Sequence, residues 1–109
     1  MKEIEWLEKM LEVQTRGEPA ALATVIRTKG SVPRKAGTRM MIWNEGKLLG
    51  TIGGGCGEAE VIERAYEVMK SGKAVQHRVD LTLGLFYEDG GICGGVMDVL
   101  IEPLVKRTR

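Results

Sequence analysis

Apolar side chains recur at helical spacing in two separate stretches of the chain, residues 2–16 and 58–72. In the first stretch they form one stripe with a second row beside it: Ile4, Leu7 and Leu11, flanked by Trp6, Met10 and Val13. In the second they form a single stripe: Val61, Ile62, Ala65, Val68 and Met69. Side chains three and four residues apart share one face of a helix. The pattern therefore predicts two amphipathic helices, the first ending near Gly17 and the second near Gly72.

Five further segments have the composition of β-strands. Residues 19–28 are largely apolar or small on both faces, which is typical of an interior strand. Residues 38–43 and 47–52 flank the short turn 44–46 and predict a hairpin. The last two predicted strands are residues 74–81, which alternate, and residues 96–104, which end near Pro103. The order α-β-β-β-α-β-β predicts an α+β domain in which two helices cover a mostly antiparallel sheet of about five strands.

Size and composition indicate one globular domain, residues 1–109. The net charge is +1 and aromatic residues make up 5% of the chain, which argues against nucleic acid or an anionic membrane as a partner. The chain has no apolar run of membrane-spanning length and no signal-peptide pattern at its N-terminus. We therefore expect a cytoplasmic protein, in which Cys56 and Cys93 are thiols rather than a disulfide.

The segment "GTIGGGCGEAE" (50–60) places Cys56 directly after Gly53, Gly54 and Gly55, at the predicted start of the second helix. Free amides at a helix start, turned inward by glycines, form a concave site for an anion. The same field lowers the pKa of a thiol and favours the thiolate. The pattern is typical either of a presented thiolate or bound anion, or of a tight turn that happens to contain a buried cysteine. The local sequence leaves both interpretations open.

Cys93 has a similar neighbourhood, because "GGICGG" surrounds it with glycines that include Gly94 and Gly95. Two such cysteines in a chain with only two are more informative than one, although the sequence does not place them side by side. Two cysteines and the single histidine, His77, are too few for a structural zinc site, which takes four ligands. We expect His77 to be a half-buried structural residue on a strand face shared with Val75 and Val79.

Cations are concentrated in residues 27–39, with no acid among them: Arg27, Lys29, Arg34, Lys35 and Arg39. Ser31 and the amide of Gly30 add further donors, so this loop would suit a phosphate group. The alternative is an ordinary solvated basic loop. The glycine run itself is not a P-loop, since no "GK[ST]" follows it, and it does not match the dinucleotide-binding pattern.

Three segments together resemble one known family. "GSVPRKAGTRMMI" (30–42), "GTIGGGCGEAEVIERA" (50–65) and "ICGGVMDVLIEPL" (92–104) resemble, in order and spacing, the N-terminal domain of the XdhC/CoxI family of xanthine dehydrogenase accessory proteins. The resemblance implies a chaperone for the molybdenum cofactor (molybdopterin) rather than an enzyme with turnover. Such a protein binds the cofactor as cargo, protects it during sulfuration and assists its insertion into the apo-form of a molybdenum hydroxylase. A cysteine desulfurase would supply the sulfur.

Carried over by motif, the resemblance makes Cys56 the key residue in contact with the cofactor and its metal. The other residues that the motifs place at the cofactor are Gly53, Gly54, Gly55, Ser31, Pro33, Arg34, Cys93, Gly94, Gly95 and Glu58. Glu58 could equally be an acid that suits the helix start. Two features differ from the family pattern. Members continue into a second, Rossmann-like domain, and they usually have a larger apolar residue where this chain has Gly57.

Two other functions remain open at this level. In one, Cys56 carries a persulfide as a sulfur carrier, which needs an accessible thiol of low pKa. In the other, the chain is an oligomeric, partner-binding module without a ligand. A homodimer would complete a pocket across a two-fold axis, and the sequence leaves the oligomeric state open.

Overall fold

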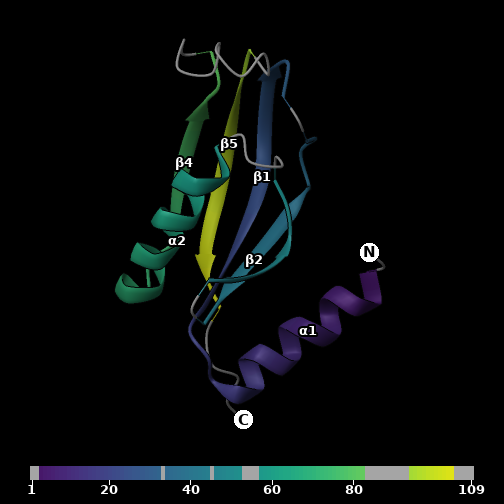
Figure 1. Cartoon of the computed structure of the whole chain (residues 1–109), viewed down its shortest axis with the longest axis vertical. Helices are drawn as coiled ribbons and strands as arrows, with labels where there is room; N and C mark the ends of the chain where they lie inside the picture. Colours follow the sequence, from purple (N-terminus) through teal and green to yellow (C-terminus); the bar gives the residue numbers. More distant parts are fainter. Residues whose placement is uncertain (1–2, 33, 45, 53–56, 83–93, 105–109) are drawn as a thin grey trace.

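The computed structural model describes residues 3–32, 34–44, 46–52, 57–82 and 94–104 (Figure 1). Its elements, in order, are α1 (Glu3–Arg16), β1 (Ala20–Gly30), β2 (Arg39–Trp43), β3 (Lys47–Gly50), α2 (Glu58–Ser71), β4 (Val75–Asp80) and β5 (Gly95–Pro103). This order confirms the predicted α+β fold, and the element bounds agree with the predicted ones to within two residues. Neither helix in this part of the chain is long and apolar enough to cross a membrane.

The five strands form one sheet in the order β3-β2-β1-β5-β4, and every neighbouring pair is antiparallel. The last strand in the sequence therefore enters the middle of the sheet, between β1 and β4. Gly30 at the end of β1 lies opposite Gly95 at the start of β5. The register between these strands shifts between Val25 and Arg27, so Ile26 is the extra residue of a β-bulge.

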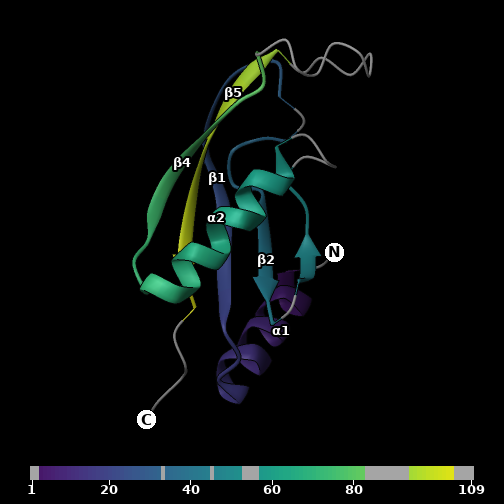
Figure 2. The ribbon, with the colours of Figure 1, turned by 60° about the vertical axis from the view of Figure 1, so that its left-hand side comes forward.

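Helix α2 covers one face of the sheet and encloses the larger core (Figure 2). Val61, Ala65 and Val68, on the predicted stripe of α2, are buried there. The strand side chains that meet them alternate along each strand, as the pleat requires. They are Ala21, Ala23, Val25, Met40, Ile42, Val79, Met97, Val99 and Ile101.

Helix α1 packs on the opposite face, over β2 and the beginning of β1 (Figure 2). Trp6 and Val13 are its buried residues, whereas the predicted main stripe of Ile4, Leu7 and Leu11 is exposed. The helix is thus rotated toward the row that contains its tryptophan. Arg39 of β2 fixes this orientation, since its guanidinium lies 2.7 Å from the carboxylate of Glu3 and 5.0 Å from the ring centre of Trp6.

Candidate functional site

The first and third of the family-like segments meet at one end of the sheet. The start of β5 lies so close to the chain after β1 that a side chain on Gly95 has no space. A Cβ atom there would lie 2.5 Å from the carbonyl oxygen of Ser31 and 2.6 Å from that of Lys29. Glycine at this position therefore allows residues 29–32 and 94–95 to pack backbone against backbone.

The second segment comes to the same end of the sheet at Gly57, which faces Leu81, the residue that follows β4. The Leu81 amide donates to the Gly95 carbonyl at 2.8 Å, and its carbonyl accepts from the Gly94 amide at 3.2 Å. On the other side, a Cβ built on Gly57 would lie 3.6 Å from Leu81 Cδ2. Gly57 follows Cys56 in the sequence and Gly94 follows Cys93. The residue after one cysteine is therefore hydrogen-bonded to Leu81, and the Cβ direction of the residue after the other faces the same leucine.

The glycine–cysteine stretch 53–56 is bracketed by a hydrogen bond. Thr51 Oγ1, before the stretch, donates to the carboxylate of Glu58, the first residue of α2. Gly57 lies between them with φ of 74°, in the left-handed region that favours glycine. This bond joins the described residues on either side of the stretch, Thr51 and Glu58. Glu58 is therefore the acid at the start of α2 and a hydrogen-bond partner of Thr51, and its role at a cofactor stays a prediction.

Several predicted site residues lie outside the described part of the chain. These are Gly53, Gly54, Gly55, Cys56, Pro33 and Cys93. Their contacts, and the metal-binding role predicted for Cys56, stay predictions. Within the described ranges, no group of three or more His, Cys, Asp and Glu residues could hold a metal ion. Of the described candidates, Gly94, Gly95 and Ser31 come together, and Glu58 lies at the start of α2.

The predicted basic loop is divided by the fold. Arg27 and Lys29 belong to β1, and Arg39 begins β2, where it pairs with Glu3. Arg34 stays in the connecting loop, exposed and with an interaction partner. The prediction of one uninterrupted basic loop over residues 27–39 is therefore wrong at both ends. Its acid-free sequence was misleading, because acids from distant segments pair with its two outer arginines.

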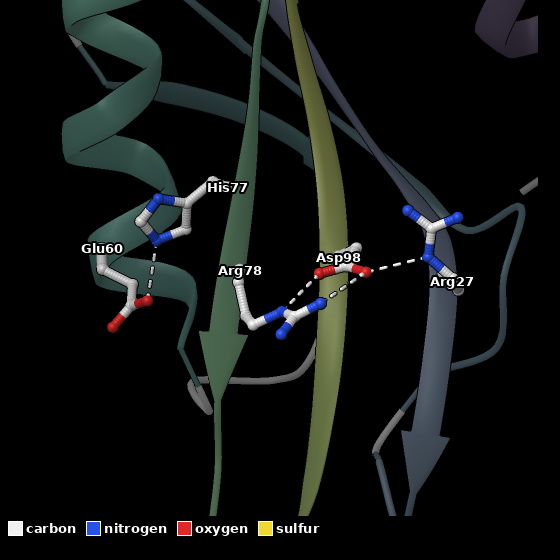
Figure 3. Close-up of polar contacts among 5 residues, drawn as sticks. All are labelled: Arg27, Glu60, His77, Arg78 and Asp98. Carbon is white, nitrogen blue, oxygen red and sulfur yellow. Dashed lines mark hydrogen bonds and ion pairs between the residues drawn. The ribbon is translucent and has the colours of Figure 1, made fainter.

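A cluster of charges that the sequence analysis did not predict lies on β1, β5 and β4 (Figure 3). Asp98 of β5 accepts from Arg27 Nε at 2.9 Å on one side and from Arg78 Nε at 3.0 Å on the other. Its side chain is only 6% exposed, although the two arginines are 64% and 70% exposed. Hydrogen bonds from Arg78 and then Arg27 lower the pKa of the Asp98 carboxyl. One sequence feature could have indicated this cluster: Asp98 is the single acid within the apolar strand "VMDVLI".

The lowered pKa of Asp98 predicts a loss of stability in acid. Above an ordinary aspartate pKa of about 4, the ionised carboxylate stabilises the fold in full, and this contribution is lost as the pH falls toward the folded-state pKa. The difference in melting temperature between the wild type and Asp98→Asn should therefore be constant from about pH 8 to about pH 5 and shrink below about pH 4.

Thermal unfolding followed by circular dichroism measures this difference. Thr82 lowers the pKa of Asp80 through its hydroxyl and its amide, so Asp80 titrates in the same range. Because Asp80 is present in both proteins, its contribution largely cancels in the difference. A difference that stayed constant down to about pH 3 would show that Asp98 does not carry the acid dependence.

His77 has the role that the sequence predicted. It faces α2 and its Nε2 lies 2.8 Å from the carboxylate of Glu60, a partner that the sequence analysis did not identify (Figure 3).

The sequence analysis also did not identify three residues that contact the candidate site: Thr51, Leu81 and Val79. Only Thr51 had a sequence signal, because it lies at the border of the glycine run.

Similar proteins and a family model identify the relatives of this chain. Residues 13–80 of the chain match the XdhC and CoxI family. A protein of Bacillus subtilis (strain 168) that is named as a probable xanthine dehydrogenase subunit is 30% identical over 105 residues, which are 94% of this chain and 31% of that protein. The "Molybdenum cofactor insertion chaperone PaoD" of Escherichia coli (strain K12) is 33% identical over 63 residues, 58% of this chain and 20% of that protein.

A solved structure is similar as well. A crystal structure described as a xanthine dehydrogenase from Bacillus halodurans matches with a TM-score of 0.80 and 30% identity, over 95% of this chain and 31% of that one. The chain thus spans less than a third of the length of these relatives. Since the family match covers more than half of the chain and confirms the resemblance found in the sequence, the chain belongs to the XdhC and CoxI family.

Proposed function

We propose that this chain is a molybdenum-cofactor-binding accessory protein. In this proposal it holds the cofactor as cargo, protects it during sulfuration and assists its insertion into a molybdenum hydroxylase such as xanthine dehydrogenase. The observation that carries the proposal is the meeting of the three family segments at one end of the sheet, where Gly94 is hydrogen-bonded to Leu81 and Gly57 faces the same leucine. Family membership and a relative named as a molybdenum cofactor insertion chaperone support it.

The chemistry of the converging segments suits such a cargo. A thiolate is a soft ligand, which fits Cys56 as the contact to the metal or its dithiolene. Glycines at Gly53 to Gly55 would let a ligand approach the backbone closely, and Ser31, Pro33 and Arg34 would form one wall of the pocket. Cys93, Gly94 and Gly95 would form the second wall. Glu58 at the helix start would complete the set and hold the segment through Thr51.

The partners follow from the same proposal. The apo-hydroxylase receives the cofactor, and a cysteine desulfurase supplies sulfur to it in the cytoplasm. We place this role on residues 1–109 as a single domain. A homodimer would complete the pocket across a two-fold axis.

Molybdenum retention tests the assignment of Cys56. The chain is mixed anaerobically with cofactor released from a molybdenum hydroxylase, desalted, and assayed for bound molybdenum. We expect near-stoichiometric retention by the wild type and loss of most of it in Cys56→Ala. The matched thiol variant, Cys93→Ala, should lose less, because Cys93 lines the pocket without contacting the metal.

The opposite ranking of the variants would assign the metal contact to Cys93. Equal retention by all three proteins would exclude a metal contact by either thiol. If the wild type retained no molybdenum but accepted a persulfide on Cys56, the sulfur-carrier alternative would replace the chaperone.

A further inference from the structure

The sheet face opposite α2 is only partly covered. Helix α1 packs over β2 and the beginning of β1, whereas the residues of β1 from Ile26 to Gly30 are all exposed. Side chains of β4 and β5 that alternate with the buried core residues also point to this face. A pocket of about 400 Å³ lies there, lined by Arg27, Thr28, Lys29, Arg78, Val96 and Asp98.

The pocket is basic although it contains an acid. Three cations, Arg27, Lys29 and Arg78, line the pocket with the one carboxylate of Asp98, which leaves two positive charges in excess among the lining residues. Asp80 lies next to Arg78 along the strand face and its negative charge acts on Arg78, so one net positive charge remains when Asp80 is included. Two guanidinium groups held on one carboxylate repel each other, and a bound anion would relieve this repulsion.

Asp98 also positions the two arginines. Its carboxylate accepts a hydrogen bond from the Nε–H of each arginine. It accepts a further, longer hydrogen bond of 3.5 Å from Arg78 Nη2. Among the contacts of the described residues, both terminal nitrogens of Arg27 and Nη1 of Arg78 have no protein acceptor. Figure 3 shows Arg27 joined to Asp98 through Nε, with its two terminal nitrogens outside this contact. A buried acid therefore holds two exposed arginine forks in place and leaves most of their donors for a ligand.

We propose that this pocket binds a dianionic oxyanion of the phosphate class, with Arg27 and Arg78 as the ligating residues and Asp98 as the residue that positions them. Guanidinium forks match the paired oxygens of a phosphate or sulfate and bind them through two parallel hydrogen bonds. An anion would offset the net positive charge that remains around the pocket. The pocket lies on the sheet face opposite α2 and shares β5 with the third family segment, but none of its lining residues is among those proposed to contact the cofactor.

An NMR titration of the full chain tests the proposal. Sodium sulfate, inorganic phosphate and glycerol 3-phosphate are each added and compared with sodium chloride at equal ionic strength. We expect saturable shifts at the Nε–H groups of Arg27 and Arg78 and at the amides of the pocket, and none with chloride. Tighter binding of glycerol 3-phosphate than of inorganic phosphate would identify a phosphomonoester as the ligand. Equal binding of the two would identify the free phosphate ion as the ligand. Each of these results supports the site.

Variants separate binding from structure. Arg27→Gln and Arg78→Gln should each weaken sulfate binding at least about tenfold, because each removes charged hydrogen bonds to the anion. Arg27→Lys keeps the charge but not the fork, and should also weaken it. Arg64→Gln is the matched control, since Arg64 is an exposed arginine of α2 that pairs with Glu67 at 2.6 Å, and it should bind sulfate like the wild type.

The proposal fails if sulfate gives no saturable shift beyond that of chloride. It also fails if folded Arg27→Gln, with a dispersed wild-type-like spectrum, binds sulfate as tightly as the wild type. Full binding by Arg27→Lys would overturn the assignment to paired guanidinium donors.

Discussion

Replacing Gly57 by alanine is expected to lower the free energy of unfolding by roughly 3 kcal/mol. Two costs add at this position. The backbone has φ of 74°, which is strained for any residue with a Cβ atom. The new Cβ would also overlap Cγ1 of Val79, a core residue of β4. Denaturant unfolding followed by circular dichroism measures the loss, and α2 should be present in both folded proteins.

A double-mutant cycle separates the two costs. Val79→Ala alone should destabilise the chain by about 2 kcal/mol, because it leaves a cavity in the core. In the double variant Gly57→Ala/Val79→Ala the overlap disappears, so the combined loss should be smaller than the sum of the single losses by about 1 kcal/mol or more. Strict additivity would show that Val79 does not limit the space at Gly57. The cycle would also give the reason for the departure from the family pattern at this position.

Gly95→Ala is the second substitution expected to have a large effect, again a loss of roughly 3 kcal/mol. Here the obstacles are backbone atoms, the carbonyl oxygens of Ser31 and Lys29 at 2.5 and 2.6 Å from the new Cβ. Unlike the end of a flexible side chain, these atoms cannot move without separating β1 from β5. The variant should therefore unfold at a lower denaturant concentration, and its amides near residues 29–32 should exchange faster with solvent.

Gly94→Ala is the matched control. Gly94 has φ of 75°, and a Cβ atom there would meet no atom of the described residues within 4 Å. Its substitution costs only the backbone strain, about 1 kcal/mol. Equal losses for Gly94→Ala and Gly95→Ala would contradict the close backbone packing between the first and third family segments.

The elements themselves could be predicted from the sequence because their signals are local. The stripe of Val61, Ala65 and Val68 identifies α2 and the face that it buries. The hairpin of β2 and β3 follows from two apolar runs around a short turn. The face of α1 was harder to predict, because two rows of apolar residues compete. The contact of Arg39 with Glu3 and Trp6, 36 and 33 positions away in the chain, decides between them.

The charge cluster could not be predicted, because its members are distant in the sequence. Asp98 is 71 residues from Arg27 and 20 from Arg78. Only the sheet order, with β5 between β1 and β4, brings them together. A strand pattern identifies faces but not neighbours, so Arg27 was interpreted as part of a basic loop.

The candidate site could be predicted in part. The motifs assigned Ser31 to one wall of a pocket and Gly94 and Gly95 to a second; the structure places Gly95 against Ser31, and the cofactor-binding role of these residues stays a prediction. They did not predict Leu81, which makes two backbone hydrogen bonds to the third segment and faces Gly57 of the second. A leucine after a strand has no distinguishing sequence signal, because its role depends on which backbone groups lie opposite.

Transfer of the cofactor tests the central claim most directly. The wild-type chain is loaded anaerobically with the cofactor, desalted, and added to apo-xanthine dehydrogenase. The measurement is the enzyme activity regained per molybdenum supplied. It is compared with the activity regained from the same amount of free cofactor held in the same buffer. A chaperone should yield clearly more activity than the free cofactor, because it protects its cargo until insertion. Activity no greater than that from free cofactor, or no molybdenum retained after desalting, would contradict the proposed function.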